Sequence, residues 1–279
     1  MSSVSPSPRS SKTAPPRDAA YSAPGMRIGG TMPHASPVAL LPDRLRLLDD
    51  DALRGDFVDQ GKFLFLRDFL PPTLTQAVVD GMQAARVEMN RNYLPGHKKG
   101  GSVSRHTIDK RAPVIAELYR SPALIHWLEK LAGEPLMPSP DSDPHAYALY
   151  FYTEPGDHIG WHYDTSYYKG RRYTLLLGVL DQSSSKLEYK LHTKDPTRAR
   201  TPDLDGAIGL DPGALVFFDG DMLSHRITPL GIGEERVSLT FEYVTDQRMG
   251  QWKRFISNMK DAIAYFGFKQ VFRSKKRSR

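Results

Sequence analysis

The sequence has 279 residues, 39% of them hydrophobic and 25% charged, which is the composition of an ordinary globular protein with an apolar core. No apolar run approaches the ~20 residues that a membrane-spanning helix needs, so we expect no integral membrane protein. The chain contains no cysteine. This excludes disulfides, iron–sulfur clusters, thiolate zinc sites and a cysteine nucleophile, so any metal site must use histidine and carboxylate ligands.

The net charge of +6 is concentrated at the two ends of the chain. Residues 269–279 carry +6 and residues 1–40 carry +3, which leaves −3 for residues 41–268. A nucleic-acid-binding domain shows the opposite pattern, with its basic residues on the folded surface. We therefore expect no nucleic-acid partner and no membrane partner. No targeting sequence stands out, so a cytoplasmic protein is the default expectation.

The composition also divides the chain into three parts. Residues 1–40 are rich in Ser, Pro, Ala and Gly and are expected to be a disordered extension, or an overlong start. The basic tail 269–279 is expected to be disordered too. Between them, residues 41–268 form one predicted domain, with helices over 41–135 and 250–266 flanking a strand-rich region of about 143–245.

Helical patterns dominate the first half of this domain. A charged helical stretch over Leu41–Phe57 precedes a short apolar strand, Phe63–Leu66. Thr73 or Thr75 is the expected cap of a helix that runs to about Arg91. The next segment, Asn92–Arg111, is expected to be a glycine-rich loop, either solvated or a lid whose Lys98, Lys99, Arg105 and His106 contact an anionic substrate. Two helices follow, near 112–119 and 121–132, the second ended by Gly133.

Strand patterns dominate after Pro144. We expect strands over 145–153, 173–180, 186–192, 214–218 and 236–244, before a last helix over about 251–265. The strand 236–244 alternates strictly between an apolar face and a polar face, the latter formed by Arg236, Ser238, Thr240 and Glu242. Helices followed by many short strands predict an α+β fold with a mainly β core, a barrel or sandwich flanked by helices.

Two histidines and an aspartate form the strongest candidate for chemistry. His162 and Asp164 are two residues apart, so they share one face of a strand, and His225 lies in a later apolar strand. The His-x-Asp pair alone is common by chance. Together the three residues make a two-histidine, one-carboxylate set, which leaves open positions on a bound Fe(II).

Arg236 is the second chemical feature. It points inward with Ser238 from a strand whose other face is apolar, and a buried guanidinium needs an anionic partner. A ligand carboxylate held bidentately is one candidate. The alternative is a structural ion pair with the adjacent Glu234 or Glu235.

In this order and spacing the chain resembles the iron(II)/2-oxoglutarate-dependent dioxygenases. Their pattern is His-x-Asp, a long gap, His, about ten residues, and Arg-x-Ser. Here it reads His162-x-Asp164, sixty residues, His225, ten residues, and Arg236-x-Ser238. The segment 161–170 is also similar to the branch that hydroxylates or halogenates free amino acids. The resemblance implies a double-stranded β-helix, a cupin-like jelly roll with supporting helices.

The resemblance also implies roles for individual residues. His162, Asp164 and His225 would hold Fe(II), with 2-oxoglutarate and O₂ as cosubstrates and ascorbate as a candidate reductant. Arg236 and Ser238 would bind the far carboxylate of 2-oxoglutarate. Tyr150 and Tyr152 share a strand face and either touch the cosubstrate or form barrel wall. Halogenating members lack the metal-binding carboxylate, so Asp164 disfavours halogenation.

The expected activity is hydroxylation of a small molecule, such as an amino acid or related metabolite, with succinate and CO₂ as coproducts. Two alternatives stay open. One is a cupin-like metal enzyme that does not use 2-oxoglutarate and so does not need Arg236-x-Ser238. The other is a non-catalytic barrel that binds a ligand. The sequence leaves the substrate and the oligomeric state open.

Overall fold

The computed structural model describes residues 35–195, 197 and 205–248. The helix expected over about 251–265, the tail 269–279 and residues 1–34 lie outside this part. The helices are a 3-10 helix Pro37–Leu40, α1 Leu41–Leu45, α2 Asp50–Asp59, α3 Pro72–Arg86, α4 Arg105–Arg111, α5 Pro113–Tyr119 and α6 Pro122–Ala132. No helix in the described ranges has the length and apolar content to cross a membrane.

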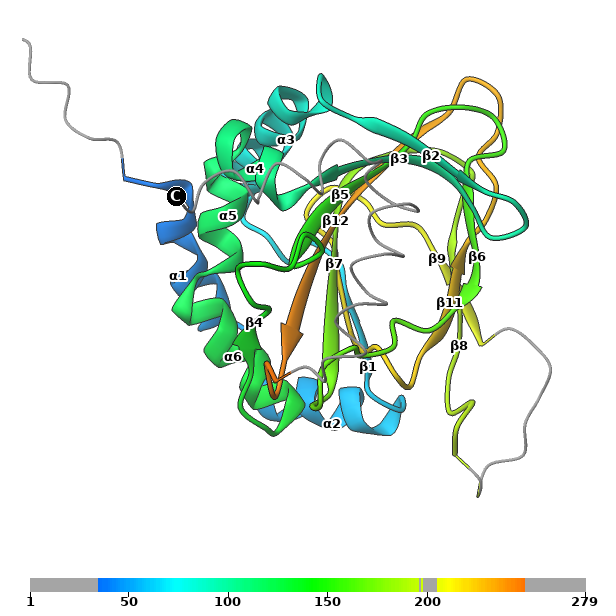
Figure 1. The fold of residues 1–279 in the computed structure, drawn as a ribbon. Helices are drawn as coiled ribbons and strands as arrows, with labels where there is room; N and C mark the ends of the chain where they lie inside the picture. The colour runs from blue at the N-terminus through cyan, green and yellow to red at the C-terminus, as the bar shows by residue number, and fades with distance from the viewer. Residues whose placement is uncertain (1–34, 196, 198–204, 249–279) are drawn as a thin grey trace, which may run out of the picture. The chain divides into compact units, whose positions relative to one another are not determined.

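The strands form one curled antiparallel sheet. They are β1 Phe63–Leu66, β2 Asn90–Leu94, β3 Lys98–Ser104, β4 Met137–Pro138, β5 Tyr147–Tyr152, β6 His158–His162, β7 Arg172–Gln182, β8 Leu187–Lys190, β9 Gly206–Ile208, β10 Leu215–Asp219, β11 Ser224–Ile227 and β12 Glu235–Val244. Their order is β1-β10-β7-β12-β5-β3-β6-β11-β8-β9, with β2 beside β3 and β4 beside β12. The sheet curls so that β6, β11 and β8 face β7, β12 and β5 (Figure 1). The predicted α+β jelly roll is confirmed.

The two faces of the sheet carry different side chains because successive strand residues point in opposite directions. On β12, Val237, Leu239 and Phe241 pack with the helices, among them Leu74 of α3 and Ile115 of α5. The helices α3 to α6 cover this outer side of the larger half of the sheet (Figure 1). The opposite face of β12 is polar and faces the inside of the barrel, as its alternation predicts.

The strand β3 joins the two halves of the sheet. Its residues Gly101–Ser104 pair with β5, whereas Lys98 and Lys99 pair with β6. The sequence predicts a loop over 92–111, and this prediction is wrong: the segment is a hairpin, β2 and β3, followed by the helix α4. The two glycines of β3 are there for packing, because a side chain on Gly101 would collide with the sulfur of Met89.

The helix α3 also differs from expectation at both ends. Its N-cap is Pro71, and neither predicted threonine caps it by a side-chain hydrogen bond. It ends at Arg86 because the chain then turns into β2. The end of α6 is as predicted: Gly133 takes a left-handed conformation, with φ of 74°, and closes the helix.

The start of the described domain lies before residue 41. Ser36 accepts a hydrogen bond from the backbone N–H of Val38 and so caps the 3-10 helix, with Pro37 in its first turn. Val38 is buried among the helices, and the Ser36 hydroxyl donates to Glu117. The extension predicted over residues 1–40 therefore does not include residues 36–40. Ser and Pro, which indicate disorder by composition, serve here as a helix cap and a first-turn residue.

We predict that this short helix stabilises the domain. A protein that lacks residues 1–40 should be less stable than one that lacks residues 1–34 by ~1–3 kcal/mol, because it loses the burial of Val38 and the Ser36 cap. Chemical denaturation of the two truncated proteins measures the difference. Equal midpoints and slopes would contradict a structural role for residues 35–40.

Candidate active site

A cavity of about 370 Å³ lies inside the barrel. Its wall combines apolar residues of the inner face with a group of polar side chains: His97, His145, Tyr150, Tyr152, His162, Tyr163, Asp164, Thr165, Tyr167, Arg172, His225, Ser238, Thr240 and Glu242. Such a volume is within the range of small-molecule sites. All three predicted metal ligands therefore lie in one cavity.

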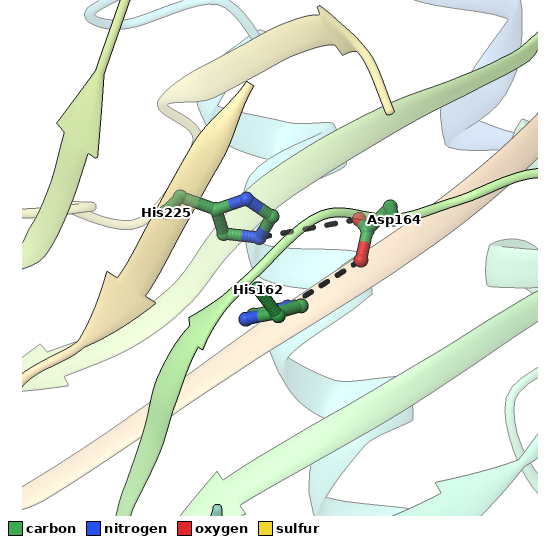
Figure 2. Close-up of side chains that lie close together, drawn as sticks. All are labelled: His162, Asp164 and His225. Carbon is green, nitrogen blue, oxygen red and sulfur yellow. Dashed lines mark ion pairs between the residues drawn. The ribbon is translucent and has the colours of Figure 1, made fainter. Parts of the chain in front are cut away.

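The three predicted ligands converge on one point. His162 at the end of β6 stands directly opposite His225 on β11 in the strand register. Asp164 follows β6 by two residues and turns toward both imidazoles, as Figure 2 shows. One ligand atom from each residue lies within 4.8 Å of the others, and the Nε2 atoms of His162 and His225 are 3.4 Å and 4.0 Å from the Asp164 carboxylate. This is a compact one-sided donor set for a metal ion.

Hydrogen bonds fix the orientation of each ligand. The Nδ1 atoms of His162 and His225 face the backbone carbonyls of Gly160 and Leu223, at 2.8 Å and 3.4 Å. Donation from Nδ1–H leaves the Nε2 lone pair directed at the centre, a common arrangement for metal-binding histidine. Asp164 is held by the hydroxyl of Thr174 on β7, at 2.9 Å.

The electrostatics favour a carboxylate at Asp164 and act in opposite directions on the two imidazoles. Burial alone would raise the pKa of Asp164, but the bond with His162 and the neighbouring charges outweigh it and hold that pKa well below its usual value. Burial lowers the pKa of His225 to about 4. Burial alone would also lower the pKa of His162, but the hydrogen bond and charge of Asp164 outweigh burial and raise that pKa. Asp164 and His225 thus have the protonation states that a divalent metal needs, whereas a metal would compete with a proton on His162.

Arg236 lies at the inner end of the barrel and is 1% exposed. Its Nη1 atom donates to Asp181 at 3.1 Å and to the carbonyl of Ser185 at 3.0 Å. Its ion-pair partner is therefore Asp181, whereas Glu235 pairs with Arg86 and Glu234 accepts bonds from Ser184. The Nε and Nη2 atoms, which form the other edge of the guanidinium, are buried and find no hydrogen-bond partner among the described residues.

The other predicted cosubstrate contacts border the cavity near this arginine. In the strand register Ser238 stands opposite Tyr150, and Arg236 stands opposite Tyr152. Ser238 and both tyrosines line the cavity, whereas Arg236 is not among the lining residues. Whether they touch the cosubstrate stays a prediction.

An ion pair at the metal end of the cavity was not expected from the sequence. Arg172 of β7 and Glu242 of β12 form it, and the Thr174 hydroxyl lies 3.2 Å from the same Glu242 oxygen, Oε2. Burial raises the pKa of Glu242, while the charge of Arg172 opposes the rise. The sequence indicated that Glu242 shares the inner face with Arg236. Nothing in the sequence indicated that Arg172 would pair with Glu242, because the pairing depends on the β7–β12 register.

The hairpin β2–β3 adds a further cavity residue. His97, just before β3, lines the cavity with its ring centroid 5.9 Å from that of His162. Lys98 and Arg105, expected in a solvated or mobile loop, are both buried. His158 is on β6 but outside the triad, and its Nδ1 atom lies 2.8 Å from the carbonyl of Gly156.

Part of the chain matches a known protein family. Residues 49–169, which include His162 and Asp164, match the family model described as Halogenase D. No curated protein matches the sequence.

Several solved structures share the fold at low sequence identity. The non-haem α-ketoglutarate-dependent epimerase SnoN from nogalamycin biosynthesis is 15% identical, with a TM-score of 0.55 over 70% of this chain and 80% of that chain. A prolyl hydroxylase from Trichoplax adhaerens is 14% identical, with a TM-score of 0.55 over 78% and 96%. The carbocyclase SnoK of the same biosynthesis is also 14% identical, with a TM-score of 0.55 over 72% and 85%. The fold is that of the iron(II)/2-oxoglutarate-dependent oxygenases.

We predict that metal binding to this oxygenase fold depends on the triad and not on neighbouring imidazoles. His162→Ala or His225→Ala should abolish stoichiometric Fe(II) binding, because each removes one of three ligands. His158→Ala, on the same strand as His162, is the matched control and should bind like the wild type. Anaerobic calorimetry with Fe(II) makes the comparison. Equal affinities in His162→Ala and His158→Ala would contradict the assignment.

Proposed function

We propose that this protein is an Fe(II)- and 2-oxoglutarate-dependent dioxygenase that hydroxylates a small molecule such as an amino acid. The observation that carries the proposal is the triad in a cavity that Ser238 also lines, with the guanidinium of Arg236 two residues along the same strand and only one of its edges hydrogen-bonded. This combination suits a cosubstrate that binds metal at one end and presents a carboxylate at the other.

The donor set fits ferrous iron. His162, Asp164 and His225 supply two neutral nitrogens and one anionic oxygen on one side of the metal, which leaves positions for other ligands. The described residues of this centre offer no thiolate, since the chain has no cysteine. Bound iron would supply the position at which O₂ reacts with 2-oxoglutarate.

The inner end of the cavity fits a carboxylate. Asp181 occupies only the Nη1 corner of Arg236 and so orients the guanidinium. The Nε–Nη2 edge presents two parallel N–H donors, the geometry that binds a carboxylate bidentately. A buried donor pair without an acceptor is costly, and a bound carboxylate removes that cost. Ser238 lies two residues along the same strand face to add a hydroxyl.

The metal end of the cavity fits a substrate that carries both an ammonium group and a carboxylate. Glu242 accepts from Arg172 through Oε2, which leaves Oε1 as an acceptor, and both residues of the pair line the cavity. An ammonium group would bind Glu242 and a carboxylate would bind Arg172. A free amino acid carries both groups, which is why we favour this substrate class.

The proposed reaction is balanced as written. Substrate R–H, O₂ and 2-oxoglutarate give R–OH, succinate and CO₂, with one oxygen atom of O₂ in each of the first two products. The protein contributes the orientation of the ligands, cationic side chains that bind the two carboxylates, and the exclusion of water. No separate acid or base is assigned.

The family model named Halogenase D raises halogenation as a second activity. A halide needs a metal position that a carboxylate otherwise fills. Asp164 fills that position here, held by Thr174 and facing both histidines. We therefore propose hydroxylation rather than halogenation for this chain.

We predict that the purified protein converts 2-oxoglutarate to succinate only with Fe(II) and O₂, and that one free amino acid stimulates the rate. The measurement is succinate formation across a panel of amino acids, with product mass as the second readout. A gain of one oxygen atom in the product supports hydroxylation. Metal-dependent turnover of a substrate without any need for 2-oxoglutarate would instead establish the cupin-like alternative.

We predict that Arg236 governs cosubstrate affinity. Arg236→Lys should keep the charge but lose the bidentate geometry and raise the KM for 2-oxoglutarate, with Fe(II) affinity unchanged. Arg236→Ala should cost more, about 2–5 kcal/mol of cosubstrate binding, and high 2-oxoglutarate should restore part of the rate.

The control for this experiment is Arg226→Lys. Arg226 lies on β11 and pairs with Glu188, away from the cavity wall, so its replacement should leave the KM unchanged. An unchanged KM in Arg236→Ala would refute the cosubstrate role of Arg236.

A further inference from the structure

His97 is a cavity residue that the proposed function does not use. It is half-buried, lines the cavity, and lies edge-to-face against His162, with ring centroids 5.9 Å apart. The imidazoles of His158, His162 and His225 each face a backbone carbonyl, whereas that of His97 has no such partner among the described residues. Both of its ring nitrogens are therefore left for a ligand.

The backbone of His97 is held from two directions. Its N–H donates to the carbonyl of Leu94 at 3.0 Å and closes a turn through Pro95 and Gly96, where Gly96 supplies the positive φ of 72° that this turn requires. Its carbonyl accepts a 2.7 Å hydrogen bond from the N–H of Gly160 on β6. These bonds fix the place of the imidazole in the cavity wall, as a residue that orients a ligand requires.

His97 and Glu242 lie in facing walls of the barrel, with the metal ligands next to both. His97 is bonded to β6, whereas Glu242 is on β12, which β6 faces across the barrel (Figure 1). The Thr174 hydroxyl lies 2.9 Å from Asp164 and 3.2 Å from Glu242, so Glu242 is on the Asp164 side of the metal centre. His97 is on the His162 side.

A substrate that spans these walls meets His97 with its side chain. Under the proposed function, the ammonium and carboxylate groups of an amino acid bind Glu242 and Arg172, and its side chain then extends past the metal ligands toward His97. An imidazole can donate at one nitrogen and accept at the other. A site built to form a hydrogen bond discriminates strongly against an analogue that lacks the bonding group, because a polar atom of the site is then left unpaired.

We propose that His97 determines substrate specificity by selecting amino acids whose side chain carries a hydrogen-bonding group. The inference rests on the proposed function and narrows its substrate class from amino acids to polar amino acids. It adds a residue from the tip of the hairpin β2–β3, outside the segment that carries the motif His-x-Asp to Arg-x-Ser. His97 contacts the substrate and is not one of the metal ligands.

The test compares amino acids that have the same shape but differ in one polar group. The pairs are threonine with valine, asparagine with leucine, and lysine with 2-aminoheptanoate. The measurement is kcat/KM for amino-acid-stimulated succinate formation by the full chain with Fe(II) and saturating 2-oxoglutarate. His97→Phe keeps a flat ring and removes both nitrogens. His158→Phe is the matched control, because His158 is on β6 but does not line the cavity.

We expect the wild-type protein to prefer the polar member of the pair that it accepts, and His97→Phe to reduce this preference roughly 5- to 100-fold, the effect of one lost hydrogen bond. His97→Gln keeps a hydrogen-bonding group and should retain part of the preference. His158→Phe should retain all of it. The Fe(II) affinity of His97→Phe, measured by anaerobic calorimetry, should equal that of the wild type. If His97→Phe does not fold, His97→Leu takes its place.

Three results would overturn the proposal while leaving the proposed function intact. The first is a wild-type protein that prefers the apolar member of the pair. The second is an unchanged preference in His97→Phe. The third is an equal loss of kcat/KM for both members of the pair, which would indicate a structural role. Succinate formation that no amino acid stimulates would instead refute the substrate class of the proposed function, and this inference with it.

Discussion

The pairing of β6 with β11 is the constraint on which the candidate site depends. It places His162 directly opposite His225, although the two strands are far apart in sequence. A shift of one residue would turn one imidazole to the outer face, because side chains alternate along a strand. The β7 strand supplies the third element, since Thr174 holds Asp164 against both imidazoles. The metal centre is therefore a property of strand register.

The barrel interior buries more charge than an apolar core would tolerate. The Arg172–Glu242 pair lies near the metal centre, and the Arg236–Asp181 pair lies at the inner end. A buried ion pair contributes little to stability, because the loss of hydration offsets the attraction. Apolar residues of similar size would serve the fold at least as well. The proposed function gives the ion pairs a different role, since the Nε–Nη2 edge of Arg236 has no partner among the described residues and the Arg172–Glu242 pair lines the cavity.

Patterns within one strand were enough to predict most of the barrel from the sequence. The spacing across strands singled out His162, Asp164 and His225, which the structure brings together. The alternation on β12 correctly separated its apolar and polar faces, and the spacing from His162 to Arg236 indicated the order of the site. What the sequence could not supply were partners set by long-range register, such as Asp181 for Arg236. The hairpin β2–β3 was missed for a local reason, because lysines beside glycines are typical of a solvated loop. Here Gly101 makes room for Met89, and alternation sends Lys98 inward.

The two ends of the cavity differ in how much they say about function. The solved structures that share this fold are named as an epimerase, a prolyl hydroxylase and a carbocyclase, at 14–15% identity to this chain. A fold that supports such different reactions does not specify a substrate. A metal site and a carboxylate site are needed for any reaction that uses 2-oxoglutarate, whereas the residues beyond the metal meet a different molecule in each case. Under the proposed function, substrate choice in this chain comes from the metal end of the cavity, where Arg172 and Glu242 are joined by His145, Thr165 and Tyr167.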